Sequence, residues 1–309
     1  MKRGFNKQRI TAMKKKTVII IIAAAVLLHV IVAAFLPTPI IYGALFGRYD
    51  AEAPEVGLER ERTEFKSGRN TLTGYHYDAG EGENGILVVI VSGFHAVQGE
   101  YAPVAEAFLE RGFDVFTFDP TGCGESEGAD QIGFPQIRED IAACLDCVAE
   151  NGNFGCTEVC LLGHSRGGYG VCCMLDDCEG ISSAASVGGY NSAMDAVMQS
   201  SVDSFGKAAY LNYPALWTWQ AILFGGSAVN DSAVSSVNSS DTPVLIIQGE
   251  DDSVAKPDGG SIYSHADELD ESASVTLVPG GHVDSLYTDA GANGELIDMI
   301  AAFFMENAG

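Results

Sequence analysis

The segment 163–168, with the sequence GHSRGG, contains a serine in a setting suited to nucleophilic catalysis. It follows the apolar run 159–162 and precedes a helix-compatible segment that begins at Tyr169, so the expected local structure is a strand, a sharp turn and a helix. Such a turn strains the backbone and lifts the serine side chain clear of the sheet, and the flanking glycines leave room for it. The pattern predicts Ser165 as the nucleophile of an acyl-transfer reaction.

Two later loops extend this pattern. The apolar run PVLIIQ at 243–248 is followed by GEDDSV, and the run SVTLVP at 274–279 is followed by GGHVDS. Together with the serine segment, these motifs resemble the α/β-hydrolase family, in which a nucleophile on a strand-to-helix turn is followed in the chain by an acid and then a histidine. The resemblance covers roughly residues 60–306 and implies an α/β-hydrolase fold.

The resemblance also implies a Ser-His-Asp triad. His282 occupies the position of the family's general base, and Asp252 is the preferred acid, with Asp251 and Glu250 as alternatives. In such a triad the histidine takes the proton of the serine, while the carboxylate fixes the imidazole tautomer and stabilises the cation that forms. Asp119, in the segment DPTGCGESEG that resembles the family's D-x-R-G-x-G-x-S loop, is expected to fix that loop instead.

A further loop at a strand end resembles a family segment. After the apolar run 86–91 comes SGFHA, which is similar to the family's H-G-x loop with Ser92 in place of the histidine. The resemblance implies an oxyanion hole formed by the backbone amides of Phe94 and Arg166, which would stabilise the negative charge that develops on the substrate carbonyl oxygen. His95 could reach the site or cap its own loop, and capping is preferred.

The elements that must position these residues alternate along the chain from residue 60. A hairpin is expected first, then strands that alternate with helices, then an amphipathic closing helix. The expected strands are 63–67, 72–78, 86–91, 113–118, 159–162, 181–187, 243–248 and 275–278, and the expected helices are 100–111, 136–150, 169 onward and 295–305. This alternation predicts a mostly parallel sheet between helices, with the active groups at the carboxyl ends of the strands.

The N-terminal residues predict membrane attachment. Residues 1–16 contain seven Lys and Arg and no acid, and residues 18–36 form an uncharged run of nineteen. A helix of that length spans about 30 Å, which matches a bilayer core, and the positive flank favours a cytoplasmic N-terminus. The expected segments are a basic cytoplasmic tail (1–16), a single transmembrane anchor (17–36), a membrane-proximal linker (37–60) and an extracytoplasmic hydrolase domain (61–309). Cleavage of a signal peptide near 32–34 is the alternative.

The charge balance argues against nucleic acid as a partner. Beyond residue 16 the chain has 10 Lys and Arg against 42 Asp and Glu, a net charge of −32. Phosphate backbones and anionic lipid headgroups both repel such a surface, so the domain is expected to stay near the membrane through its anchor alone.

Eight cysteines lie between Cys123 and Cys178, and an even number permits disulfides outside the cytoplasm. Cys172 and Cys173 are expected in the core, with one or two disulfides among the other six. No histidine neighbours the C-x-x-C pair Cys144 and Cys147, so a metal site is not expected there. No cofactor is expected either.

The connection between residues 187 and 243 is longer than a plain helix connection requires, which predicts a cap at 190–240. This segment contains Met194, Met198, Tyr210, Tyr213, Trp217, Trp219 and Phe224. We expect this group to line apolar space above Ser165 and to favour uncharged esters of short to medium acyl chains.

The predicted function is that of a membrane-anchored serine hydrolase that cleaves an ester or small amide bond in a small-molecule substrate. The alternatives are a serine peptidase or amidase, an acyltransferase and a non-catalytic binding protein on the same fold. The presence of all three candidate triad residues disfavours the last of these. Neither the substrate nor the oligomeric state follows from the sequence.

Overall fold

The computed structural model describes residues 16–24, 27–28, 31–32, 35–51, 54, 56–80 and 84–309. The predicted basic tail therefore lies outside the described residues except for Lys16, and the predicted anchor at 17–36 is described only in part. Its described positions are helical as far as Phe35. Among the described residues, no helix combines the length and the hydropathy that crossing a bilayer requires.

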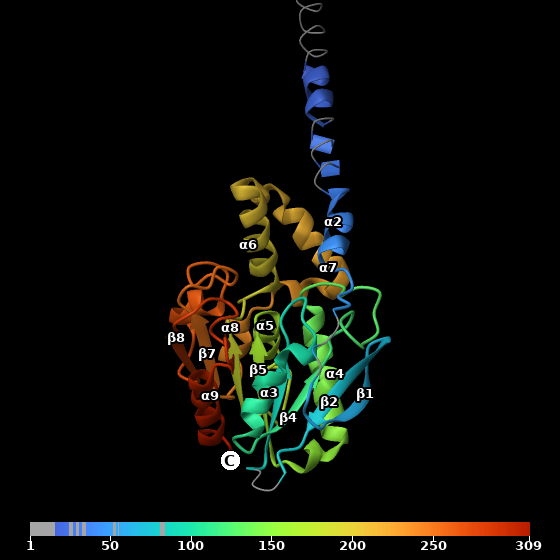
Figure 1. The fold of residues 1–309 in the computed structure, drawn as a ribbon. Coiled ribbons are helices and arrows are strands. Elements are labelled where there is room, and N and C mark those ends of the chain that lie inside the picture. The colour runs from blue at the N-terminus through green and yellow to red at the C-terminus, as the bar shows by residue number, and fades with distance from the viewer. Residues whose placement is uncertain are drawn as a thin grey trace, which may run out of the picture.

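An eight-stranded sheet forms the centre of the molecule, in the order β1-β2-β4-β3-β5-β6-β7-β8 (Figure 1). The strands are β1 (Glu61–Ser67), β2 (Asn70–Tyr77), β3 (Ile86–Val91), β4 (Asp114–Phe118), β5 (Glu158–His164), β6 (Ser183–Val187), β7 (Val244–Gly249) and β8 (Ala273–Val278). Strands β3 to β8 are parallel to their neighbours in this group, while β2 is antiparallel to both β1 and β4. The prediction of a mostly parallel sheet is confirmed.

The central strands are buried on both faces, as β3 illustrates. All six residues of its sequence ILVVIV are buried. Leu87, Val89 and Val91 belong to one hydrophobic cluster, whereas Ile86, Val88 and Ile90 belong to the other, because successive side chains point to opposite faces of a sheet.

Helices cover both faces of this sheet (Figure 1). On one side α5 (Arg166–Cys173) packs between α4 (Gln136–Glu150) and α8 (Ala233–Asn238), and on the other α3 (Ala102–Leu109) packs against α9 (Gly294–Glu306). The smaller elements are η1 (Gln98–Tyr101), η2 (Gly152–Gly155), η4 (Ile262–Glu268), β9 (Tyr287–Thr288) and β10 (Gly291–Ala292).

The long connection between β6 and β7 is helical, as predicted for a cap. It contains α6 (Ala193–Phe205), η3 (Gly206–Asn212) and α7 (Tyr213–Asn230) before it returns to the body through α8. The Ser192 hydroxyl begins α6 by accepting the amide hydrogen of Asp195, which satisfies one of the otherwise unpaired donors of a helix start. In Figure 1, α6 and α7 stand at the end of the molecule toward which the parallel strands point.

The segment expected as a linker at 37–60 packs onto the domain over part of its length. Helix α2 (Thr38–Leu45) contacts α7, and Tyr42 and Phe46 are buried. The Arg48 guanidinium then donates to the carbonyl oxygens of Ser126, Gly128 and Gly124. The apolar patch at 40–46 thus supplies one face to the domain core, a role that the sequence analysis had not assigned to it.

No disulfide joins any of the eight cysteines, all of which lie within the described residues, so the expectation of one or two disulfides is wrong. Seven of them are buried within strands, helices and loops of the core, where each packs as a small apolar side chain. Burial raises the pKa of Cys160 to about 11 and that of Cys172 to about 12, so both stay protonated thiols at neutral pH. The predicted core position of Cys172 and Cys173 is confirmed.

Candidate active site

Ser165 lies on the sharp turn between β5 and α5. Its backbone has φ 56° and ψ −116°, a conformation that non-glycine residues adopt rarely and that costs free energy. The neighbours make the turn possible, since a Cβ on Gly163 would collide with the backbone of Gly167, and a Cβ on Gly167 with the carbonyl of Val91. The G-x-S-x-G pattern is therefore a steric requirement of this turn.

The structure brings Ser165, His282 and Asp252 together from three different loops. Ser165 Oγ lies 2.8 Å from His282 Nε2, and His282 Nδ1 lies 2.8 Å from Asp252 Oδ2. Since a carboxylate can only accept, Nδ1 carries the proton and Nε2 is free to accept the hydrogen of the serine hydroxyl. This tautomer is the one that a general base for Ser165 requires.

Neighbouring donors hold the Asp252 carboxylate in place. Its Oδ1 accepts the backbone amides of Val254 and Ala255 at 2.8 and 2.9 Å, and its Oδ2 also accepts from Gln248 Nε2 at 3.0 Å. Asp252 is buried, whereas the alternative acids Asp251 and Glu250 are exposed. Of the three candidates, Asp252 is the one in contact with His282.

A second histidine connects the loops around Ser165. The hydroxyl of Tyr101 accepts the Gly93 amide at 2.9 Å and lies 2.8 Å from His164 Nδ1, while His164 Nε2 lies 2.9 Å from the carbonyl oxygen of His282. The carbonyl can only accept, so Nε2 donates and Nδ1 accepts the tyrosine proton. Burial first, and then the nearby His282, lowers the pKa of His164 to about 4. A neutral His164 thus joins the Gly93 loop to the loop of the candidate base, a role that the sequence analysis missed.

The loop after β3 passes directly over the serine. A Cβ placed on Gly93 would lie 3.3 Å from the Ser165 Cβ and 3.3 Å from the Tyr101 hydroxyl oxygen, which is tighter than most Cβ contacts, so glycine eases this approach. Within the described chain, the backbone amides of Phe94 and Arg166, predicted to form an oxyanion hole, donate to no other residue. The ring of His95 stacks on Phe94 of its own loop and on Tyr49, with centroids 4.0 and 5.3 Å apart, and it also borders a cavity next to Ser165 and His282.

The side chain of Arg166 has a structural task of its own. It is fully buried and donates to the Phe134 carbonyl at 3.1 Å, to Gln131 Oε1 at 3.2 Å and to the Gly133 carbonyl. Burial lowers the pKa of this guanidinium. Because all three acceptors belong to one loop, Arg166 fixes the position of Phe134 beside Ser165.

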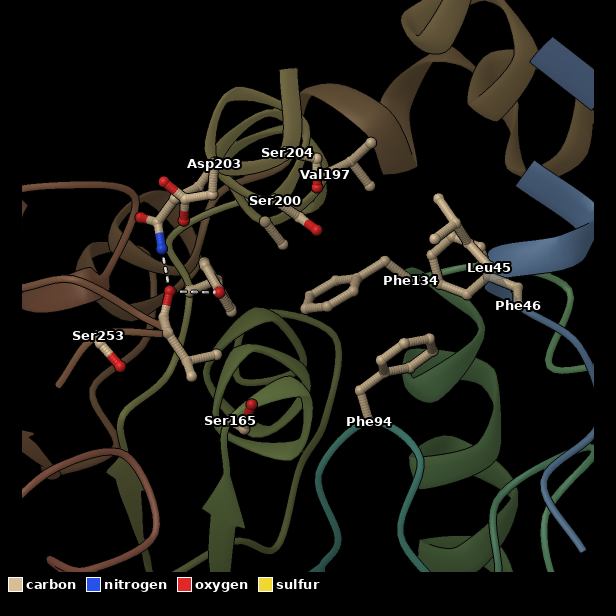
Figure 2. Close-up of a pocket in the computed structure, with 14 residues that line it drawn as sticks. Leu45, Phe46, Phe94, Phe134, Ser165, Val197, Ser200, Asp203, Ser204 and Ser253 are labelled. Carbon is tan, nitrogen blue, oxygen red and sulfur yellow. Dashed lines mark hydrogen bonds between the residues drawn. The ribbon is translucent and has the colours of Figure 1, made fainter. Parts of the chain in front are cut away.

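An apolar cavity of about 320 Å³ extends from Ser165 toward α2 and α6 (Figure 2). Its apolar wall consists of Leu45, Phe46, Phe94, Phe134, Tyr190, Ala196, Val197 and Val254, and its polar rim of Gln199, Ser200, Asp203, Ser204 and Ser253. A second cavity, of about 370 Å³, also borders Ser165 and is lined further by His164, His282, Glu100 and Tyr287. Ser165 and Phe94 border both cavities.

None of the seven cap residues expected to line apolar space above Ser165 borders the apolar cavity, so that expectation is wrong; the aromatic residue of 190–240 that does border it is Tyr190. Trp217 donates to Asn230 Oδ1, and both Trp217 and Trp219 pack against the hydrophobic core. Met194, Met198, Tyr210 and Tyr213 border a separate groove, and Phe224 borders a third. The cavity wall comes instead from Phe46, Phe94 and Phe134, which belong to segments far apart in the sequence. The apolar patch at 40–46 was the one available signal for Phe46.

Asp119 lies outside the triad. Its Oδ1 accepts the Gln98 amide and its Oδ2 the Glu125 amide, at 2.8 and 2.9 Å. The predicted loop-fixing role is therefore confirmed. Among the residues that the structure describes, no cluster of three or more His, Cys, Asp or Glu side chains is arranged to hold a metal ion.

Comparisons with known proteins agree with this architecture. Residues 82–209 match the serine aminopeptidase family S33. The chain is 28% identical over 226 residues to the uncharacterized protein YfhR of Salmonella typhi, covering 69% of this chain and 73% of that protein.

Solved structures are similar in fold. The esterase Pf2001 of Pyrococcus furiosus has a TM-score of 0.66 at 16% identity, covering 86% of this chain and 99% of that chain. An acylaminoacyl peptidase of Pyrococcus horikoshii has a TM-score of 0.58 at 15% identity, covering 81% of this chain and 41% of that one. Est1E of Butyrivibrio proteoclasticus, solved with ferulic acid, has a TM-score of 0.59 at 18% identity, covering 79% and 98%. Together with the strand order and the turn at Ser165, these similarities identify an α/β-hydrolase fold.

Proposed function

We propose that this protein is a serine hydrolase that cleaves carboxylic esters through an acyl-enzyme. The observation that carries the proposal is the continuous arrangement of Ser165 Oγ, His282 and Asp252, with 2.8 Å at each step. The S33 match and the similarity to esterases support the same class of chemistry.

The reaction follows from the positions of these groups. Ser165 Oγ attacks the substrate carbonyl carbon while its proton passes to His282 Nε2, and Asp252 stabilises the imidazolium that forms. The amides of Phe94 and Arg166 donate to the developing oxyanion. His282 then gives the proton to the departing alcohol. In the second step His282 takes a proton from water as the water attacks the acyl-enzyme, and it returns that proton to Ser165 Oγ as the acid is released. No other group has to supply or remove a proton.

Covalent labelling of the full chain with a fluorophosphonate tests the nucleophile. The parent protein should react, and Ser165→Ala should not. Ser253→Ala is the matched control because Ser253 also lines the apolar cavity, and it should react as the parent does. Labelling that survives in Ser165→Ala would exclude this serine as the nucleophile.

An amidase or peptidase activity is the second candidate, and the S33 match and the acylaminoacyl peptidase fold are what support it. Comparing kcat/KM for p-nitrophenyl esters and for aminoacyl p-nitroanilides separates the two activities. Product analysis with and without an added alcohol separates hydrolysis from acyl transfer. Faster turnover of the anilides than of any ester would favour the peptidase.

We also propose that residues 17–36 anchor the protein in the cell membrane as a single pass, with the hydrolase domain outside the cytoplasm. The support is the uncharged run that follows seven cations, together with the exposure of its described large apolar side chains. The protein should stay with membranes through a carbonate wash. If a C-terminal fusion to a reporter that works only in the cytoplasm is active, the orientation is the opposite of the one proposed.

A further inference from the structure

We propose that α2 and the cap form a bilayer-facing rim through which the acyl chain of a membrane lipid ester reaches Ser165. The rim is defined as Ile40, Ile41, Leu45, Phe205, Tyr210, Leu211, Tyr213, Ile222 and Leu223, all exposed. The inference rests on the proposed hydrolase function and deepens it, since it assigns an ester that resides in a bilayer as the substrate class.

The apolar side chains of the rim are highly exposed, and their contact with water is unfavourable. Leu211 is 81% exposed, Ile40 75% and Ile222 67%. Large apolar side chains gathered at one site on a soluble surface typically mark a contact with a partner protein or a membrane. Because α2 contacts α7, and α6 contacts η3 and α7, these side chains belong to one end of the molecule.

The charge pattern identifies a lipid surface as the occupant. The chain contains 42 Asp and Glu, yet none lies between residues 204 and 230, where Lys207 is the one charged residue. Residues 37–47 carry no charge either. Acids are thus missing from the two segments that would meet hydrocarbon and anionic headgroups, where a carboxylate costs the most free energy.

The course of the chain before α2 also supports a bilayer as the surface that covers the rim. The uncharged run at 18–36 leads directly into α2 in the sequence, and in Figure 1 its described residues lie beyond the end of the domain where α6 and α7 stand. An anchor that enters a bilayer here would bring the rim against that bilayer's surface. The rim is thus continuous with the segment proposed to cross the membrane.

The apolar cavity reaches this rim from the inside. Leu45, which is 46% exposed, belongs both to the rim and to the cavity wall, and Ser165 lies at the other end of the cavity (Figure 2). An acyl chain could move from hydrocarbon past Leu45 and Phe46 to the nucleophile without entering water. Each methylene kept out of water is worth about 0.8 kcal/mol.

The test uses the full chain in phosphatidylcholine vesicles with two substrates, 1-oleoylglycerol in the bilayer and p-nitrophenyl butyrate in solution. Leu211→Glu combined with Ile222→Glu should lower kcat/KM for oleoylglycerol at least tenfold and leave the butyrate within twofold. Met305→Glu is the matched control, because Met305 is exposed on α9 near the C-terminus, and it should change neither value.

Each other outcome has a defined meaning. Equal losses on both substrates, or no loss on either, would overturn the bilayer-facing rim. A parent protein that hydrolyses neither ester would instead overturn the proposed function.

A second measurement does not depend on activity. Leu211→Trp should be quenched in vesicles of phosphatidylcholine brominated on its acyl chains, beyond the signal from Trp217 and Trp219, whereas Met305→Trp should not. Absence of quenching together with a self-associated protein would show that a second copy of the chain covers the rim, and would refute the proposal.

Discussion

The two sides of the candidate active site are built in different ways. On the side of the triad, loops at the ends of β5, β7 and β8 hold Ser165, Asp252 and His282 through buried hydrogen bonds. On the substrate side, α2 and the cap enclose an apolar cavity and leave large apolar side chains exposed. The difference shows that hydrogen bonds fix the side chains of the candidate triad, whereas apolar packing forms the wall of the cavity beside it.

The largest effect should come from the triad side. Ser165→Ala and His282→Ala should each lower kcat by about 10⁴- to 10⁶-fold, because the two groups act as a unit, and Asp252→Asn by about 10⁴-fold or less. Steady-state kinetics on p-nitrophenyl butyrate measures this. Asp251→Asn, on the exposed neighbour, is the control. A large loss in that control with a normal Asp252→Asn would move the acid by one residue.

The connection between the two sides passes through Arg166, whose side chain holds the loop that carries Phe134. Arg166→Leu leaves three buried acceptors without their donor and should lower the free energy of unfolding by about 3 kcal/mol. Arg62→Leu, which breaks exposed ion pairs, should cost under about 1 kcal/mol. Urea unfolding compares them, and equal midpoints would show that the Arg166 side chain contributes little to stability.

The bridge made by His164 predicts a pH dependence of stability. Because the folded pKa is lowered to about 4 from an ordinary value near 6.5, only the unfolded chain takes up this proton between those values. Protonation of His164 therefore leaves the free energy of unfolding unchanged above pH 6.5. As the pH falls toward 4, it lowers that free energy by up to about 3 kcal/mol. The parent should be more stable than His164→Gln at neutral pH, and this difference in the free energy of unfolding should narrow as the pH falls toward 4, because glutamine does not titrate. A difference that stays constant with pH would contradict a neutral buried imidazole.

The smallest effect should be on the substrate side. Phe46→Leu widens the apolar cavity where α2 meets it and should shift the optimum of kcat/KM toward longer p-nitrophenyl esters, by about three- to tenfold for the preferred chain. Trp219→Leu is the control, because Trp219 packs on the core and does not line the cavity. A shift in the tryptophan variant alone would place the acyl pocket under the cap, as the sequence analysis expected.

The loops of the candidate triad follow from local patterns. Apolar runs followed by glycine turns predict strands that end in sharp loops, and the resemblance to the α/β-hydrolase family then implies roles for Ser165, His282 and an acid in the loop after β7. The choice among Glu250, Asp251 and Asp252 needed the structure, because only the fold of the loop after β7 turns one carboxylate inward to the amides of Val254 and Ala255.

The substrate side could not be predicted in this way. Phe46 and Phe134 both line the apolar cavity next to Ser165 although they lie far apart in the chain. Apart from the apolar character of residues 40–46, nothing in their own neighbourhoods indicates this shared position. The tryptophans of the cap face the core for the same reason, since the orientation of α7 depends on what it packs against. The absence of disulfides among the cysteines was likewise not evident from the sequence, since seven of the eight are buried in the core.

The sequence by itself determined the strand and helix alternation, the strained turn at Ser165 and the order of the candidate triad, because steric limits and hydrophobic periodicity act over a few residues. The tertiary structure alone decided that α2 borders the apolar cavity, that His164 joins two loops and that the cap turns apolar side chains outward. These features depend on contacts between distant segments, and such contacts form only when the sheet has brought the segments together.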